Sequence, residues 1–398
     1  MKLLIIIIFY FTSLLFGQNQ NYTILISFDG FRWDYSLRGI TPTIDSIKTN
    51  GVHAVSLRPV FPSKTFPNHT SIITGMYCDS HGIISNGFAD TSGNWNSLSN
   101  ISKTNNTDWY KGEALWETLK KNNINTACYF WPASDMNNPE RRPDKYELYE
   151  HKRPYEQRIE GIINLLKLPY NERPKFLTLY FDATDTYGHN FGPNSDEINY
   201  SIKRLDSLIN NLFNGFVNIN LQDSVNVIIV SDHGMTEISP DKYINIGHIL
   251  KGFDCIIQDY GPFMTINSAD NNIDDIYTRL KENENHFKVY TKDNIPGYFH
   301  YSNDKNIYPL ILSAELGWSL ITDKNLKWLN TTKGNHGYNN NYIDMHGTFI
   351  AAGPDFKKGY KTGTIWNIDI YPLLCKLYGI APNKNIDGKL ERIEFILK

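Results

Sequence analysis

The 398-residue chain is poor in cysteine and in net charge. A chain of this length does not need disulfides to hold a core, and its four cysteines form no CxxC pair or zinc-ribbon spacing. One or two disulfides are compatible with the sequence, without an indicated pairing, but Cys128 and Cys375 lie in apolar stretches typical of buried free thiols. The net charge of −3 argues against non-specific nucleic-acid binding and against polybasic attachment to membranes.

Long apolar runs are also scarce, because only the N-terminus carries one. Lys2 precedes an apolar run from Leu3 to Phe16, which is shorter than the roughly 20 residues that cross a bilayer. The basic start, apolar middle and small residue at the exit predict a secretory signal peptide at residues 1–17. An N-terminal anchor helix is the alternative. We expect an exported mature protein, periplasmic or secreted, without a transmembrane anchor.

The remainder has the pattern of a globular α/β protein. Hydrophobic residues make up 41% of the chain, and short β-rich runs alternate with helical patterns, which predicts a mainly parallel central sheet flanked by helices. Residues 18–398 are predicted to form one domain, with an insertion at about 255–330 where the alternation breaks down. Strands are expected at 23–28, 175–181, 225–230 and 348–352, and helices at 113–121, 155–166, 198–212 (capped by Asn194 or Ser195) and 369–378.

Acidic and histidine side chains follow three of these strands. Ligands in open α/β sheets gather at the carboxyl ends of the strands, so these side chains are expected to converge. Three carboxylates without neighbouring cations repel one another, and a bound metal pair removes that repulsion. Mixed histidine and carboxylate ligands favour zinc over manganese or iron. Any one Asp–His pair is equally typical of a strand-end cap or core histidine, but together the candidates are Asp29, Asp185, His189, Asp232, His233 and His336.

A nucleophile candidate lies in a proline-containing segment after the first strand. Pro67 suits the first turn of a helix that runs to Gly75. Thr65 is expected just before that helix, where the helix dipole favours an anion and where a metal-coordinated hydroxyl can attack phosphorus. The alternative is that Ser63 or Thr65 only caps the helix.

Seven short motifs occur in order along the chain. They are Asp29-Gly30, Lys64-Thr-Phe-Pro-Asn-His69, His81-Gly-Ile-Ile-Ser-Asn86, Trp131-Pro-Ala-Ser-Asp135, Asp185-x-x-Gly-His189, Ser231-Asp-His-Gly-Met235 and His336-Gly-Tyr338. Together they resemble those of the ectonucleotide pyrophosphatase/phosphodiesterase family, in the alkaline phosphatase superfamily. The resemblance covers nearly the whole mature chain and implies an alkaline-phosphatase-like fold.

The resemblance implies two zinc ions and hydrolysis of nucleotide phosphodiester or pyrophosphate bonds to nucleoside 5′-monophosphates. Thr65 would attack phosphorus and form a phospho-threonine intermediate, which a second displacement would release. One zinc would be held by Asp185, His189 and His336, and the other by Asp29, Asp232, His233 and Thr65.

The same resemblance implies substrate contacts. Phe66 and Tyr149 match positions that sandwich a nucleobase, Tyr180 is a candidate edge contact, and Asn86 matches a residue that hydrogen-bonds a non-bridging phosphate oxygen. Core packing is an equal alternative for Tyr149 and Tyr180, and a turn before Gly87 is one for Asn86.

Other functions stay open on the sequence. A choline or lipid phosphodiesterase would use the same metal core, because aromatic rings also bind quaternary ammonium groups. A phosphomonoesterase is disfavoured, because the segment around Thr65 has no arginine for a dianionic phosphate. A non-catalytic secreted binding protein is the alternative of another class, although all seven expected ligand positions are filled. We expect a small phosphodiester substrate and no stable nucleic-acid complex; the sequence does not indicate the oligomeric state.

Overall fold

The computed structural model describes residues 21–97 and 105–398, so the predicted signal peptide at residues 1–17 lies outside the described residues. Within the described ranges, no helix has both the length and the apolarity that crossing a membrane requires. All four cysteines are unpaired, and Cys78, Cys128 and Cys375 are buried, as the apolar surroundings of the last two predict.

An eight-stranded sheet forms the centre of the larger part of the molecule. Its strands run in the order β19-β2-β18-β9-β1-β8-β6-β7, and only β18 is antiparallel to its neighbours. The four predicted strands are confirmed as β1, β8, β9 and β18. The bounds are β1 Tyr22–Phe28, β2 Val52–Ala54, β6 Thr126–Tyr129, β7 Lys145–Glu147, β8 Phe176–Phe181, β9 Val225–Val230, β18 Phe349–Ala352 and β19 Tyr360–Thr362.

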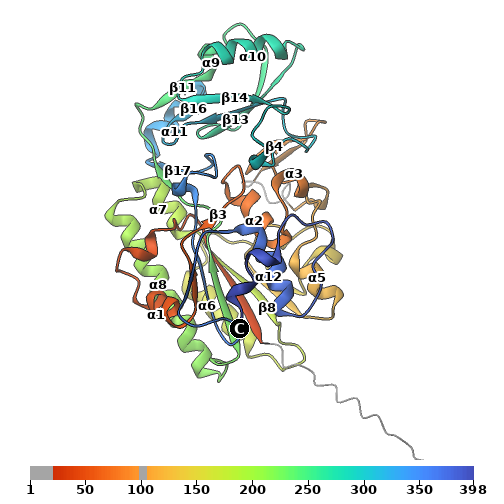
Figure 1. Ribbon diagram of the computed structural model, residues 1–398, viewed down its shortest axis with the longest axis vertical. Helices are drawn as coiled ribbons and strands as arrows, with labels where there is room; N and C mark the ends of the chain where they lie inside the picture. The colour runs from red at the N-terminus through yellow and green to blue at the C-terminus, as the bar shows by residue number, and fades with distance from the viewer. Residues whose placement is uncertain (1–20, 98–104) are drawn as a thin grey trace, which may run out of the picture.

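Helices cover both faces of this sheet, because side chains alternate along the buried strands. Ile24 and Ile26 of β1 belong to the hydrophobic core on one face, and Leu25 belongs to the core on the other. The first core contains side chains of α1 Pro42–Asn50, α6 Tyr155–Leu166 and α8 Asp196–Asn218, and the second those of α2 Thr65–Thr74, α5 Leu115–Lys121 and α12 Ile370–Leu377 (Figure 1).

Helix α8 shows why the periodicity of the sequence was informative. Its apolar positions at intervals of three and four residues are buried against the sheet. Of the two predicted caps, Ser195 is the N-cap, and its Oγ accepts a hydrogen bond from the backbone N–H of Ile198 at 3.1 Å.

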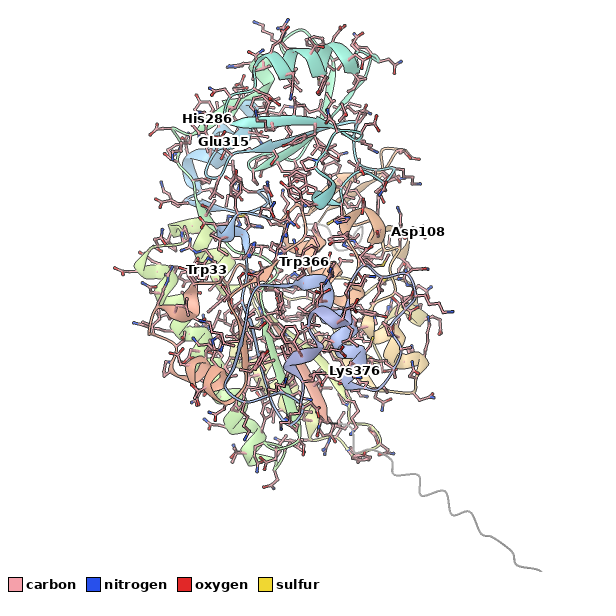
Figure 2. The ribbon with its side chains drawn as sticks, viewed as in Figure 1. Trp33, Asp108, His286, Glu315, Trp366 and Lys376 are labelled. Atoms are coloured by element: carbon pink, nitrogen blue, oxygen red, sulfur yellow. The ribbon has the colours of Figure 1, made fainter. Side chains whose placement is uncertain are left out.

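A second, smaller sheet lies at the opposite end of the molecule from the C-terminus (Figure 1). It is antiparallel in the order β12-β13-β15-β14 and packs against α10 Ile273–Glu282 around its own hydrophobic core. At its edge, His286 and Glu315 pair at 2.8 Å between Nδ1 and Oε2 (Figure 2). The strands are β12 Cys255–Gln258, β13 Phe263–Ser268, β14 Phe287–Thr291 and β15 Leu310–Ala314.

The structure contains further short helices and strands. They are α3 Cys78–His81, α7 Ala183–Phe191, α9 Ile246–Ile249, α11 Leu326–Thr331, β3 Leu57–Arg58, β4 Gly87–Ala89, β5 Trp95–Ser97, β10 Thr236–Glu237, β11 Tyr243–Asn245, β16 Ser319–Ile321, β17 Gly334–Asn335 and β20 Ile365–Trp366.

Candidate metal centre and active site

The register of the central strands brings the predicted ligands together. Ser27 near the end of β1 pairs with Tyr180 of β8 on one side and with Val230 of β9 on the other, so the three strands end at the same edge. The six candidate ligands form two groups, and within each group the candidate ligand atoms lie within 4.8 Å of one another. The groups are Asp185, His189 and His336, and Asp29, Asp232 and His233.

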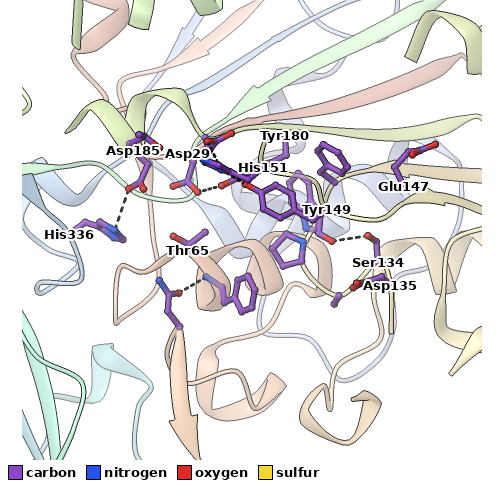
Figure 3. A pocket seen from close by; sticks show the side chains of 18 of the residues that line it. Asp29, Thr65, Ser134, Asp135, Glu147, Tyr149, His151, Tyr180, Asp185 and His336 are labelled. Carbon is purple, nitrogen blue, oxygen red and sulfur yellow. Dashed lines mark hydrogen bonds and ion pairs between the residues drawn. The ribbon is translucent and has the colours of Figure 1, made fainter. Parts of the chain in front are cut away.

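The first group is built on α7 and on the loop after β17. His189 follows Asp185 by one helical turn, and its Nε2 lies 3.3 Å from Oδ1 of Asp185. His336 approaches the same oxygen from the other side, with Nε2 at 3.4 Å (Figure 3). One carboxylate oxygen therefore faces two imidazole nitrogens, although no hydrogen bond is formed.

The second group is buried at the ends of β1 and β9. Nε2 of His233 lies 3.2 Å from Oδ1 of Asp29 and 3.2 Å from Oδ2 of Asp232. The ring of His233 also stacks on that of His336, with centroids 3.5 Å apart and planes at 9°. This stack joins the two groups into one cluster, called the metal-ligand cluster below.

The backbone fixes the orientation of all three histidines in the cluster. Nδ1 of His189 lies 2.8 Å from the carbonyl oxygen of Gly334, Nδ1 of His233 lies 2.8 Å from that of Gly234, and Nδ1 of His336 lies 2.9 Å from that of Ser63. Since a carbonyl oxygen only accepts, Nδ1 carries the proton in each case. A neutral ring then presents its Nε2 lone pair to the cluster, which is the arrangement of a metal ligand.

The carboxylates supply an independent test of metal fit. Oδ1 of Asp29, Oδ1 of Asp185 and Oδ2 of Asp232 are buried without a hydrogen-bond partner. Leaving a charged oxygen unpaired in the interior is costly, and a divalent cation removes that cost. Three unpaired carboxylate oxygens facing three imidazole lone pairs therefore fit a divalent-cation site.

The pKa values of the cluster reflect the same buried, unpaired charges. Burial and the neighbouring charge of Asp29 raise the pKa of Asp232 well above its usual value. Burial is the largest influence on His233 and opposes its protonation, but the carboxylates of Asp232, Asp29 and Asp185 together outweigh burial and raise the pKa of this histidine to about 10. A cation bound at Nε2 would take the place of that proton. Burial and the charge of His233 lower the pKa of His336. The group of Asp29, Asp232 and His233 thus favours positive charge, whereas His336 is neutral.

Thr65 lies beside this cluster, with Oγ1 3.3 Å from Nε2 of His233. The expectation that it sits just before the helix is wrong by one residue, because Thr65 is the first residue of α2 and Lys64 is the N-cap. Neither Ser63 nor Thr65 caps the helix through its hydroxyl. The N-cap residue is Lys64, whose side chain makes no capping hydrogen bond, and Oγ of Ser63 donates to the carbonyl of Tyr338 at 2.9 Å. The capping alternative is therefore not supported.

His69 is a contributor that sequence reasoning missed, although it ends one of the motifs. One turn after Thr65, its Nδ1–H donates to the carbonyl oxygen of Thr65 at 2.9 Å, and its Nε2 accepts from the hydroxyl of Ser27 at 2.8 Å. Burial lowers the pKa of His69 to about 4, so the ring is neutral at physiological pH. It ties the first residue of α2 to the end of β1.

Close backbone approaches explain Gly234, in one of the motifs, and Gly334, two residues before His336. A Cβ on Gly234 would stand 2.1 Å from the carbonyl oxygen of Asp344, and one on Gly334 would stand 2.4 Å from that of Gly188. A side chain at either position would therefore force the backbone apart, and for Gly334 the backbone that would move is that of Gly188, the residue before His189. Gly234 follows His233 directly, and the carbonyl of Gly334 orients His189.

A cavity of about 290 Å³, called the first groove, opens from the cluster, and it contains all four predicted substrate contacts. Oδ1 of Asn86 accepts a hydrogen bond from the backbone N–H of Phe66 at 2.9 Å. Tyr149 is 39% exposed and makes edge contacts with Phe130 and Tyr180. Figure 3 shows Asp185 and His336 at one end of the cavity and Glu147 at the other, with Thr65 and Tyr149 between them.

Tyr180 has a contact that the sequence did not predict. Its hydroxyl donates to Oδ2 of Asp29 at 2.6 Å, so the phenol is engaged with the metal-ligand cluster as well as lining the cavity. His346, outside the predicted ligand set, hydrogen-bonds Ser56 and the carbonyl of Asn340 instead.

Comparison with known proteins identifies the family of this chain. A family model described as type I phosphodiesterase/nucleotide pyrophosphatase matches residues 23–339. The chain belongs to this family. Its members among the relatives are named as phosphodiesterases and nucleotide pyrophosphatases, which are hydrolases. The resemblance inferred from the motifs is therefore confirmed.

Among the relatives is ectonucleotide pyrophosphatase/phosphodiesterase family member 1 of Homo sapiens, 36% identical over 93% of this chain and 41% of the relative. Bis(5′-adenosyl)-triphosphatase enpp4 of Xenopus laevis is 34% identical over 94% of this chain and 81% of the relative. The chain spans less than half the length of several curated relatives it matches.

Solved structures confirm the alkaline-phosphatase-like fold. Murine ectonucleotide pyrophosphatase/phosphodiesterase 5 superposes with a TM-score of 0.90 at 28% identity, over 95% of this chain and all of that chain. That structure is of an inactive threonine-to-alanine variant in complex with AMP.

Proposed function

We propose that this protein is a zinc-dependent phosphodiesterase/pyrophosphatase that hydrolyses nucleotide phosphodiester or pyrophosphate bonds and releases nucleoside 5′-monophosphates. The observation that carries the proposal is the position of Thr65. Its hydroxyl stands at the N-terminus of a ten-residue helix and 3.3 Å from a histidine of the metal-ligand cluster. A hydroxyl so placed meets an incoming phosphoryl group where negative charge is favoured.

Two zinc ions account for the donor set. Asp185, His189 and His336 would hold one, and Asp29, Asp232, His233 and Thr65 the other. When bound, the ions would neutralise the carboxylates and supply Lewis-acid stabilisation of negatively charged oxygens.

Thr65 performs the first displacement in this proposal. Its Oγ1 forms a bond to phosphorus as the bond to the leaving group breaks, and the hydroxyl proton goes to the leaving oxygen, so the nucleotidyl group becomes a phosphodiester of Thr65. In the second displacement a water oxygen bonds to phosphorus, the bond to Oγ1 breaks and Thr65 recovers its proton. The net reaction consumes one water and releases a nucleoside 5′-monophosphate.

Asn86 and the start of α2 position the phosphate. Because Oδ1 of Asn86 already accepts the N–H of Phe66, the Nδ2 group is the donor left for a non-bridging phosphate oxygen. The same bond holds Phe66 in place beside the nucleophile.

Phe66 and Tyr149 form the proposed nucleobase clamp. Both line the first groove together with Thr65, and the exposed face of Tyr149 leaves room for a stacked ring. The AMP complex of the murine relative supports a nucleotide as the kind of ligand, and the inactivity of its threonine-to-alanine variant supports a role for a threonine in the reaction.

We also propose that residues 18–398 form one catalytic domain and that the protein is exported after removal of residues 1–17. N-terminal sequencing of protein recovered outside the cytoplasm of its cell tests the cleavage. A mature chain that still begins at Met1 would contradict it.

Three chromogenic esters test the proposed function. Zinc-loaded protein should prefer the p-nitrophenyl ester of thymidine 5′-monophosphate over p-nitrophenyl phosphorylcholine and p-nitrophenyl phosphate. Preference for the choline ester would retain the metal chemistry and overturn the nucleotide assignment, while turnover of none would support a binding protein.

A pair of variants tests the nucleophile within the same assay. Thr65→Ala should abolish turnover and keep most of the bound metal, whereas Thr74→Ala, the same substitution at the other end of α2, should retain activity. Activity retained in Thr65→Ala would overturn the assignment of the nucleophile.

A further inference from the structure

A carboxylate of the small antiparallel sheet reaches the segment that carries the proposed nucleophile. Asp259 lies in the turn between β12 and β13. Its Oδ1 accepts a hydrogen bond from Nζ of Lys64, and its Oδ2 accepts one from the hydroxyl of Ser85, both at 2.5 Å. Lys64 directly precedes Thr65, and Ser85 directly precedes Asn86. One side chain therefore holds the neighbours of the proposed nucleophile and of the proposed phosphate donor.

This contact is shielded from water. The side chains of Lys64 and Asp259 are 10% and 11% exposed, and Ser85 is buried. Oδ1 of Asp259 also accepts the backbone N–H of Tyr260 at 2.9 Å, so both carboxylate oxygens have partners. A shielded ion pair is favourable only when its geometry is good and its other polar atoms are hydrogen-bonded. Loss of the carboxylate alone would leave the ammonium group of Lys64 without the charge that it pairs with.

The backbone of the β12–β13 turn holds Asp259 in place. Its φ of +66° lies in the left-handed region, which residues other than glycine seldom adopt. Two backbone hydrogen bonds join Gly261 and Leu320, at 2.7 and 2.6 Å, and attach the turn to β16. A left-handed residue that its surroundings hold in this way is a candidate for a functional role.

A second contact joins the same two segments directly. Oδ1 of Asn86 accepts a hydrogen bond from the backbone N–H of Phe66 at 2.9 Å. Asp259 thus holds the residue before Thr65, and Asn86 holds the residue after it. Together with the bond from Ser85, these contacts close a ring of hydrogen bonds. The ring fixes the N-terminus of α2 relative to the loop that carries the Nδ2 group of Asn86.

We propose that Asp259 is a positioning residue for the displacement at phosphorus. By binding Lys64 and Ser85 at once, it sets the position of the nucleophile relative to the phosphate donor, the Nδ2 group of Asn86. This inference rests on the proposed function. Asp259 itself touches neither phosphate nor metal, and it acts only through the alignment of two groups that bind one phosphate. The small sheet, which supplies none of the metal-ligand cluster, thereby takes part in the reaction.

Two esters with the same leaving group test the proposal. The p-nitrophenyl ester of thymidine 5′-monophosphate and methyl p-nitrophenyl phosphate both release p-nitrophenol, and only the first carries a nucleobase. Asp259→Ala should lower kcat by about 100-fold on both esters, because a misalignment of about 1 Å at the reacting groups costs that much. KM should change by less than about threefold, since the lost alignment matters in the transition state. The zinc content should stay that of the wild type, because no metal ligand is altered.

Asp304→Ala is the matched control. Asp304 is a buried aspartate within 255–330 that also pairs with a lysine, Lys111, and neither residue lines the first groove or belongs to the metal-ligand cluster. This variant should be less stable and keep its kcat. Both variants are assayed at a temperature at which circular dichroism shows them folded. Ser85→Ala, which keeps the ion pair and removes one of the two bonds, should lower kcat by about 10-fold, and it replaces Asp259→Ala if that variant does not fold.

Three results would overturn the positioning role. The first is an unchanged kcat in folded Asp259→Ala. The second is an equal loss in Asp304→Ala, because any ion pair made by the 255–330 segment would then have the same effect. The third is a loss confined to the thymidine ester, because Asp259 would then act on the nucleobase. If the wild-type protein cleaves neither ester, the proposed function fails instead.

Discussion

The metal-ligand cluster and the first groove beside it are held in different ways. In the cluster, each histidine is held by a backbone carbonyl. In the first groove, Tyr149 is 39% exposed and is held by side chains: its ring contacts Phe130 and Tyr180 edge to face, and its hydroxyl lies 3.2 Å from Nδ1 of His151. In the proposed function, the backbone therefore fixes the catalytic groups, while the choice of substrate depends on side chains that can change at little structural cost.

The most severe test of this contrast is Asp185→Asn. Asp185 faces two ligand histidines through one buried oxygen, so replacing it should empty one metal position and lower kcat/KM by about 1,000-fold or more. Metal content measured by mass spectrometry and turnover of the thymidine ester give the two readouts.

Asp182→Asn is the matched control for this variant. Asp182 lines the same cavity but pairs with Arg158 at 3.3 Å, outside both ligand groups. It should keep both metals. Full metal content in Asp185→Asn would remove that residue from the ligand set.

Tyr180→Phe separates metal binding from substrate binding, because Tyr180 contacts the metal-ligand cluster and also lines the first groove. Loss of the 2.6 Å bond to Asp29 should weaken metal affinity by about 10- to 100-fold, because a group that orients a ligand has been removed. The KM for the thymidine ester, measured with saturating zinc, should stay close to that of the wild type. A higher KM with unchanged metal affinity would instead support the substrate contact predicted from sequence.

The sequence was most informative where a single apolar run predicted a single buried strand. The apolar strands predicted β1, β8 and β9, and their shared register made the convergence of Asp29 and Asp232 predictable. Sequence could not place Thr65 within α2, because the N-cap, Lys64, makes no side-chain bond that would mark the helix start. The antiparallel direction of β18 was equally hidden, since a buried strand reads the same in either direction.

Long-range contacts were the other gap. Nothing local in the sequence couples Tyr180 to Asp29, and the bond exists only because their strands are neighbours. The small antiparallel sheet was also not resolved into strands, because short strands and polar turns within 255–330 break the periodicity.

The pH dependence of the free energy of unfolding tests whether His346 stays neutral in the folded protein. Burial lowers its pKa to about 4, below the 6.5 of an unperturbed histidine, and its Nε2–H donates to the carbonyl of Asn340. Below about pH 6.5 the unfolded chain therefore binds a proton that the folded chain does not, and stability falls as the pH falls toward 4. Between pH 7 and pH 5 this one group should cost about 2 kcal/mol of the free energy of unfolding.

Urea unfolding of His346→Gln in the presence of EDTA measures this contribution. The variant is expected to be less stable than the wild type at pH 7, and the gap should narrow by about 2 kcal/mol at pH 5, because glutamine takes up no proton. A gap that stays constant with pH would show that His346 does not stay neutral in the fold.

Tyr149→Ala gives the smallest expected effect and the sharpest comparison between the first groove and the metal-ligand cluster. Loss of one stacking face should raise KM for the thymidine ester by about 10-fold and leave metal content unchanged, while Tyr200→Ala, an exposed tyrosine of α8, should change neither. An unchanged KM in Tyr149→Ala would show that this ring does not hold the nucleobase, and a loss of metal would show that the groove and the cluster are not independent.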